Sequence, residues 1–193
     1  MPGVKPAQTS LRCNFLTGLL WCLGFFIVMV LAPEMVSGDS DLMVHILYGR
    51  ALLENGWPTS DPLLSGITGA PVLQEWLFEV LVAWLDSQVG LTGILLLSAA
   101  LTGFLVSGIY RGMRNRGVCL WLALITALVL LFTLRTHLII RPHLLSWVGT
   151  ALLMVLVARW ERNGLQRGDL AAGGLLFLLW ANLHGGFLLG LTV

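Results

Sequence analysis

Two carboxylates and a histidine lie close together where the first apolar run of the chain ends. The stretch reads GDSDLMVH and holds Asp39, Asp41 and His45. Asp41 and His45 are four residues apart, so in a helix they share a face. An ionised carboxylate can take a proton from a hydroxyl group as a general base, and a pair can hold Mg²⁺ or Mn²⁺. The alternative is that Asp39 and Asp41 only cap the start of a helix.

A second group of polar residues combines two arginines with two histidines. The stretch RTHLIIRPH holds Arg135, His137, Arg141 and His143. Arginine binds phosphate through two parallel hydrogen bonds, which makes these residues candidate phosphate ligands. In the competing interpretation, Arg135 and Arg141 extend to lipid head groups at a membrane surface.

A third group lies inside the last apolar run, in WANLHGGF. Asn182 and His184 are candidates for function, because polar side chains within a membrane helix face protein or water rather than lipid. The alternative is a polar pair that packs helices together, with Gly185 and Gly186 allowing close contact.

The composition indicates which elements must position these groups. Hydrophobic residues make up 57% of the 193 residues and charged residues only 11%, against about a quarter charged in soluble domains. We therefore expect an all-α, polytopic transmembrane helical bundle that forms a single integral membrane domain over residues 1–193. A cleaved signal peptide is the alternative for the first run, but about 18 residues is long for a signal core. About five spans are predicted, at 14–35, 90–110, 118–134, 143–158 and 169–193.

The distribution of basic residues predicts the orientation of the chain. With the N-terminus in the cytoplasm, eight of the eleven Lys and Arg residues lie inside, as expected for membrane proteins. The eight inward basic residues are Lys5, Arg12, Arg111, Arg114, Arg116, Arg159, Arg162 and Arg167.

The net charge of +1 and the lack of a basic tail give no sign of a nucleic-acid partner.

This orientation requires that the segment 73–89 does not cross the membrane. Glu75, Glu79 and Asp86 would be costly inside a bilayer, and the apolar side chains from Trp76 to Trp84 suit an interfacial helix. Residues 36–89 are thus predicted to be a large external loop carrying two interfacial amphipathic helices. The first is expected from about Ser40 to Asn55, where Asn55-Gly56 and Pro58 form a stop signal. The alternative is that 73–89 spans.

The order of these motifs resembles the N-terminal part of bacterial GT-C-type membrane glycosyltransferases. The matching stretches are GDSDLMVHILYGRALLENGWPTSDPLLS, QEWLFEVLVAWL, RPHLLSW and WANLHGGFLLG. The resemblance implies transfer of a sugar from a polyprenyl-phosphate carrier to an acceptor outside the cytoplasm, in a bacterial plasma (inner) membrane. In members of this family a long external loop follows the first span, and a catalytic carboxylate lies at the start of that loop.

The resemblance also implies roles for individual residues. Asp39 is the better match to the catalytic carboxylate and Asp41 the second, and the pair would hold Mg²⁺ or Mn²⁺ if the enzyme needs a metal. Arg135 or Arg141 would neutralise the departing phosphate, and His45 and His184 would orient the substrate. His137, His143 and Asn182 are further candidate substrate- or phosphate-binding residues.

Relatives of this kind have about twice as many spans, whereas this chain stops at Val193 within an apolar run. We therefore expect the membrane domain to be incomplete at its C-terminus, or to be completed by a membrane-protein partner. The expected partners are a polyprenyl-phosphate-linked sugar and membrane lipids. The alternatives are a non-catalytic membrane scaffold or lipid-phosphate-binding module, and a segment of a transporter.

Overall fold

The computed structural model of the chain describes residues 6–36, 40–64, 69–134 and 141–192. The regular elements of this part are all helices, without a β-strand, which confirms the all-α prediction for these residues. In chain order the helices are α1 (Pro6–Val36), α2 (Ser40–Asn55), α3 (Trp76–Val89), α4 (Leu91–Asn115), α5 (Leu120–Leu134), α6 (Pro142–Asn163), α7 (Arg167–Leu183) and α8 (Phe187–Gly190).

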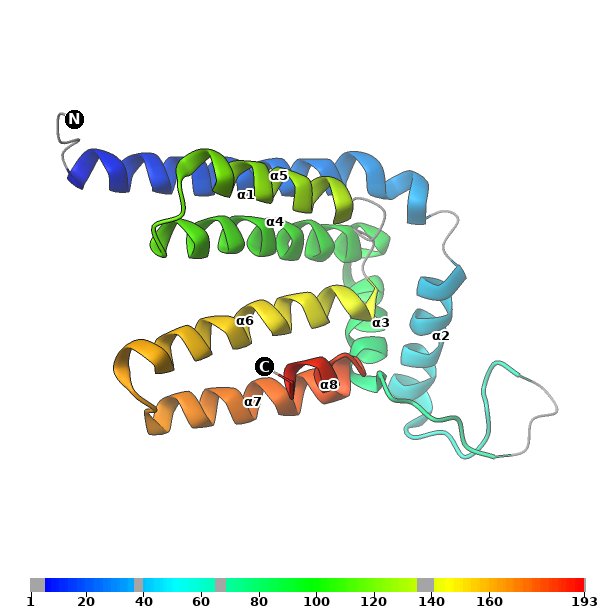
Figure 1. The fold of residues 1–193 in the computed structure, drawn as a ribbon. Coiled ribbons are helices and arrows are strands. Elements are labelled where there is room, and N and C mark those ends of the chain that lie inside the picture. The colour runs from blue at the N-terminus through cyan, green and yellow to red at the C-terminus, as the bar shows by residue number, and fades with distance from the viewer. Residues whose placement is uncertain (1–5, 37–39, 65–68, 135–140, 193) are drawn as a thin grey trace.

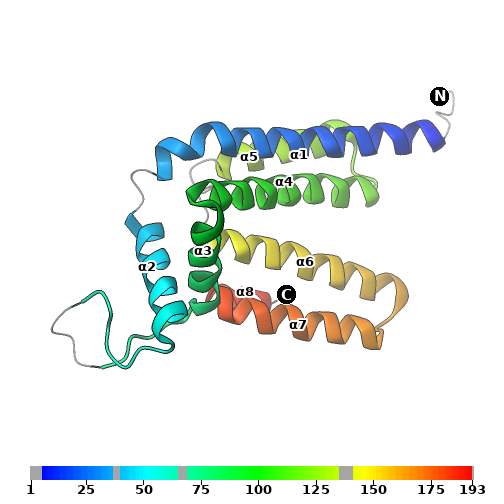
Figure 2. The same cartoon turned by 180° about the vertical axis from the view of Figure 1, so that it is seen from behind.

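The helices form two groups with different directions. The helices α1, α4, α5, α6 and α7 run side by side, while α2 and α3 lie across one end of them (Figure 1). The view from behind shows the same arrangement (Figure 2). The helix predicted from Ser40 to Asn55 has these bounds. Segment 73–89 contributes α3, which lies crosswise and is not one of the parallel helices.

A single glycine makes the corner between α3 and α4. Gly90 ends one helix and begins the next, with φ at 69°. This left-handed conformation is easy for glycine and unfavourable for residues with a Cβ. The chain therefore changes from the crosswise layer to the parallel bundle with no connecting loop.

Within the described residues, three helices are long and apolar enough to cross a membrane. They are Asn14–Leu31 within α1, the whole of α4, and α6. The apolar part of α5, Leu120–Thr133, is shorter. These lengths and compositions are those of a helical membrane protein, whereas the arrangement with five spans stays a prediction.

The apolar run 169–193 was expected to be one membrane helix, but the structure divides it into two helices, so that its crossing of the membrane stays a prediction. Helix α7 ends at Leu183, and His184 has an extended backbone before the short helix α8 begins. The break has a local cause, since the imidazole of His184 accepts a hydrogen bond from the backbone N–H of Gly186. The 17 residues of α7 reach about 26 Å at 1.5 Å per residue.

The crosswise layer is held by its own apolar core. Leu42 and Ile46 of α2 pack with Phe78 and Val82 of α3, and Ile94 joins this cluster from α4. All five side chains are at most 3% exposed. On α3 the face buried in this way also contains Glu79, whereas Trp84 of the predicted interfacial stripe is 52% exposed.

Candidate functional site

The first turns of α2 and α3 bring acidic and imidazole groups together. Asp41 and His45 lie four residues apart on α2, and Glu75 and Glu79 lie four apart at the start of α3. The two helices approach closely at Gly49, where a methyl group would collide with the backbone carbonyl oxygen of Glu79. The absence of a side chain at Gly49 thus lets the carboxylates of α3 reach the histidine of α2.

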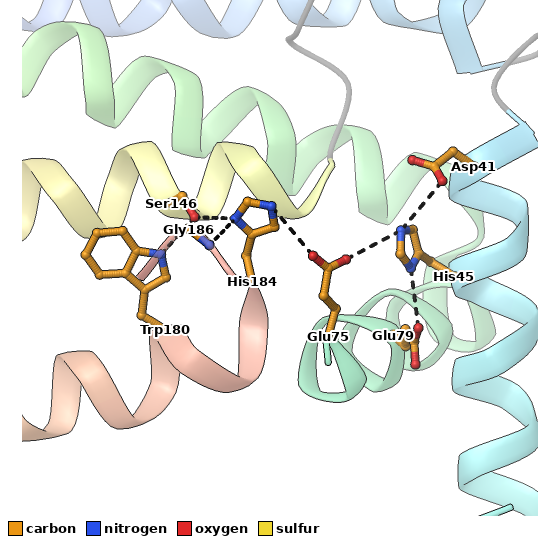
Figure 3. A network of polar contacts seen from close by, with 8 residues as sticks. All are labelled: Asp41, His45, Glu75, Glu79, Ser146, Trp180, His184 and Gly186. Carbon is orange, nitrogen blue, oxygen red and sulfur yellow. Dashed lines mark hydrogen bonds and ion pairs between the residues drawn. The ribbon is translucent and has the colours of Figure 1, made fainter. Parts of the chain in front are cut away.

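His45 is surrounded by three carboxylates (Figure 3). Its Nε2 atom lies 3.9 Å from Oδ1 of Asp41 and 3.8 Å from Oε2 of Glu75. Its Nδ1 atom lies 3.5 Å from Oε1 of Glu79. Burial lowers the pKa of His45, but the contact with Glu79 and the negative charges of all three carboxylates outweigh it, so the pKa is raised. The ring is therefore favoured in its charged form.

Glu79 is the most enclosed member of the group. Only 5% of the residue is exposed, and its Oε2 atom has no hydrogen-bond partner among the described residues. A buried carboxylate oxygen without a partner is unfavourable and is uncommon in folded proteins. Such a group calls for an explanation, such as a catalytic role or an ordered water molecule.

Glu75 connects this group to the end of α7. Although it precedes α3, its carboxylate does not cap that helix. Oε2 faces His45, and Oε1 lies 3.6 Å from Nε2 of His184. Burial raises the pKa of the Glu75 carboxyl, and Glu79 and Asp41 raise it further, while His45 opposes the change. Glu75 is thus suited to gain and lose a proton closer to neutral pH than an ordinary glutamate.

The ring of His184 is held by hydrogen bonds at Nδ1, on the side of the ring away from Glu75. Its Nδ1 atom accepts the backbone N–H of Gly186 at 3.0 Å and lies 2.6 Å from Oγ of Ser146. Trp180 donates its indole N–H to the same Oγ at 2.8 Å. Because a backbone N–H can only donate, Nδ1 is unprotonated, and the hydroxyl of Ser146 donates to it. The ring proton is therefore on Nε2, facing Glu75 (Figure 3).

Two further contacts attach the crosswise layer to its surroundings. The indole of Trp76 donates a 2.8 Å hydrogen bond to Oδ1 of Asn182, which joins α3 to α7. The hydroxyl of Tyr48 donates to the carboxylate of Asp61, which also accepts the backbone N–H groups of Leu63 and Leu64. In this structure Asn182 therefore holds the start of α3 against α7.

The structure brings some of the predicted site residues into one network. Asp41 contacts His45, Glu75 joins His45 to His184, and Asn182 lies two residues before His184. Arg141 precedes the first turn of α6, at the end of the bundle where α2 and α3 lie (Figure 1). His143 packs against the ring of Trp147, with centroids 5.5 Å apart. Asp39, Arg135 and His137 lie outside the described residues.

Four members of the network were missed as site residues from the sequence: Glu75, Glu79, Ser146 and Trp180. A usable signal existed for the two glutamates, because they are four residues apart in an otherwise apolar stretch with no basic residue beside them. No signal in the sequence distinguishes Ser146 or Trp180 from packing residues, since their partners are 34 and 38 residues away along the chain.

The network is suited to proton transfer, because its imidazoles and carboxylates lie within 4 Å of one another. Among the described residues, no three His, Cys, Asp or Glu side chains are placed to hold a metal ion. The carboxylates of Asp41, Glu75 and Glu79 surround His45 at 3.5 to 3.9 Å, so each faces an imidazole nitrogen. The predicted Asp39–Asp41 metal pair is not tested, because Asp39 lies outside the described part.

A scan against protein-family models and searches of curated proteins and of solved structures gave no match to this chain. The assignment of a function therefore depends on the geometry and chemistry of the site.

The raised pKa values predict a pH dependence of stability. A histidine whose pKa is higher in the folded state stabilises the fold fully below its unfolded pKa, and this stabilisation is lost as the pH rises through the folded pKa. Glu75 acts in the same direction, because its folded pKa is also raised. We expect the melting temperature in detergent to fall as the pH is raised above the usual pKa of histidine.

The variant His45→Gln is the control for this measurement. It removes the titrating ring that faces Asp41, Glu75 and Glu79, so its melting temperature should fall less over the same pH range. An identical pH profile in the wild type and the variant would show that His45 is not the responsible group.

Proposed function

We propose that this chain is a membrane glycosyltransferase, or the N-terminal portion of one. It transfers a sugar from a polyprenyl-phosphate carrier to a hydroxyl acceptor outside the cytoplasm, in a bacterial plasma membrane with the N-terminus inside. The observation that supports this proposal is the network from Asp41 through His45 and Glu75 to His184. It lies on crosswise helices at one end of an apolar bundle, where a lipid-borne substrate and a water-borne acceptor can meet.

Asp41 is the carboxylate proposed to act on the acceptor. Its side chain is 54% exposed, against 24% for Glu75 and 6% for Glu79, so an incoming hydroxyl can reach it. His45 holds this carboxylate from the protein side. Asp39, the better match by resemblance, lies outside the described residues and is the other candidate for this role.

In the proposed step, the acceptor hydroxyl gives its proton to the carboxylate of Asp41 while its oxygen forms a bond to the anomeric carbon. The bond between that carbon and the phosphate oxygen breaks, and its electron pair leaves with the carrier phosphate. Arg141, at the same end of the bundle, supplies positive charge to the leaving phosphate. Glu75 and His184 orient the acceptor beside Asp41.

The orientation is tested by cysteine labelling in intact cells. The native cysteines Cys13, Cys22 and Cys119 are first replaced by alanine, and a single cysteine is introduced at Ser60 or at Asn115. A membrane-impermeant maleimide is expected to label the Ser60→Cys variant in intact cells and the Asn115→Cys variant only after the cells are opened. The reverse pattern would place the network on the cytoplasmic side and contradict the proposal.

The activity itself is tested in membranes that contain the chain, with a radiolabelled polyprenyl-phosphate-linked sugar. Release of polyprenyl phosphate together with a labelled, water-soluble or lipid-linked product supports the transferase. Binding of the labelled carrier without turnover would instead indicate the alternative, a lipid-phosphate-binding module. Asp41 variants, for which a large effect is expected, connect the activity to the site.

A further inference from the structure

An apolar cavity of about 650 Å³ lies between α4 and α6, and its described lining contains no residue of the network. Its walls are formed mainly by apolar side chains, such as Phe104 and Ile109 from α4, Leu130 from α5, and Trp147 and Val155 from α6. Gly108 and Gly112 leave open space on the α4 side, where an added methyl group would meet no atom within 4 Å. The cavity is therefore a lengthwise groove between two helices.

Two arginines lie at one end of this groove. Helices α4 and α6 both run away from the crosswise layer, so Arg116, directly after α4, and Arg162, in the last turn of α6, lie at the far end (Figure 1). Both are exposed, and neither has an ion-pair partner among the described residues. Arg159, by contrast, pairs with Asp169 at 3.0 Å. Among the described residues that line the groove there is no acidic side chain.

The groove is long enough to hold an acyl chain across one leaflet of a bilayer. The groove extends about 18 Å along α4, from Phe104 to Arg116, and about 22 Å along α6, from Trp147 to Arg162, at 1.5 Å per residue. Half of a hydrocarbon core of about 30 Å is about 15 Å. An acyl chain that starts at head-group level beside the two arginines would therefore fit within the groove.

We propose that this groove binds one anionic phospholipid, with an acyl chain between α4 and α6 and its phosphate between Arg116 and Arg162. Two unpaired guanidinium groups complement a phosphate diester that carries a net negative charge. A zwitterionic lipid offers the same phosphate but adds a cation that these arginines repel. The site lies at the opposite end of the bundle from the network and does not depend on the proposed sugar transfer.

The proposal is tested by native mass spectrometry of the full chain in detergent, with equal amounts of phosphatidylglycerol and phosphatidylcholine added. The wild type is expected to retain one phosphatidylglycerol in preference to phosphatidylcholine. The double variant Arg116→Gln, Arg162→Gln should lower this preference by about 30-fold. Arg111→Gln, which removes an exposed arginine of α4 outside the groove, should leave it unchanged.

A second variant tests the apolar part of the groove. Gly112→Leu places a side chain in space that is empty, so the protein should fold while the groove is filled. It should lose retention of both lipids, whereas Gly173→Leu, at another uncrowded helical glycine, should retain phosphatidylglycerol like the wild type. An unchanged preference in the arginine double variant, or full retention in Gly112→Leu, would overturn the proposal. Displacement of the lipid by inorganic phosphate alone would also overturn it, since the acyl chain would then contribute nothing.

Discussion

Replacing Asp41 by asparagine is expected to lower the rate of sugar transfer by at least about 100-fold. The amide has nearly the same shape as the carboxylate but cannot accept a proton, and a positioned general base contributes about 10²–10⁴ to a rate. Because the side chain of Asp41 is half exposed, the variant should fold normally. The measurement is the initial rate of labelled product per amount of protein in membranes.

Two further variants make the result specific. Glu54→Gln removes an exposed carboxylate from the last turn of the same helix and should keep the wild-type rate. Asp39→Asn decides between the two carboxylates, because a loss in that variant alone would transfer the role of the base to Asp39. Full activity in both aspartate variants would contradict the proposed transferase chemistry. Retention of phosphatidylglycerol in the groove should not change in any of them, which keeps the two proposals separable.

Replacing Gly49 by alanine should destabilise the protein by about 3 kcal/mol, the upper end for an added methylene in a packed site. The new methyl group would collide with the carbonyl oxygen of Glu79 and lie 2.7 Å from Cβ of Ala83. A carbonyl oxygen of a helix backbone cannot rotate away, so α2 has to move off α3. Separation of the helices would also carry His45 away from Glu79. The measurement is thermal unfolding in detergent at constant pH.

Gly173→Ala is the matched control for this prediction. Gly173 is also within a helix, but a methyl group there meets no atom within 4 Å. This change should be neutral or stabilising by about 0.5–1 kcal/mol, because alanine favours a helix over glycine. A Gly49→Ala protein as stable as the wild type would show that the close approach of α2 and α3 does not hold the site together.

Features that depend on one helix at a time could be predicted from the sequence. The bounds of α2 follow from a polar start at Ser40 and the stop signal Asn55-Gly56. The apolar runs indicated the long helices because length and composition suffice for that. The i,i+4 spacing placed Asp41 and His45 on the same face, and both belong to the network.

Features that depend on how helices pack could not be predicted in the same way. The contact of Glu75 with both His45 and His184 requires three segments from separate parts of the chain. The break in the helix after Leu183 could not be predicted from the apolar pattern either, because it depends on the hydrogen bonds that His184 makes with Gly186 and Ser146. An apolar run predicts that a segment is kept from water. Whether the segment is one continuous helix depends on the hydrogen bonds that its few polar residues make.

The corner at Gly90 limits how the crosswise pair of helices can move. With a single residue between α3 and α4, sliding along the bundle end would stretch the backbone, and rotation about that residue is the remaining freedom. The opposite end of α3 is tied by the indole of Trp76 to the amide of Asn182. Together with the contact between Glu75 and His184, this hydrogen bond holds the start of α3 against the end of α7, so the carboxylates are positioned from a point more than ten residues from the corner.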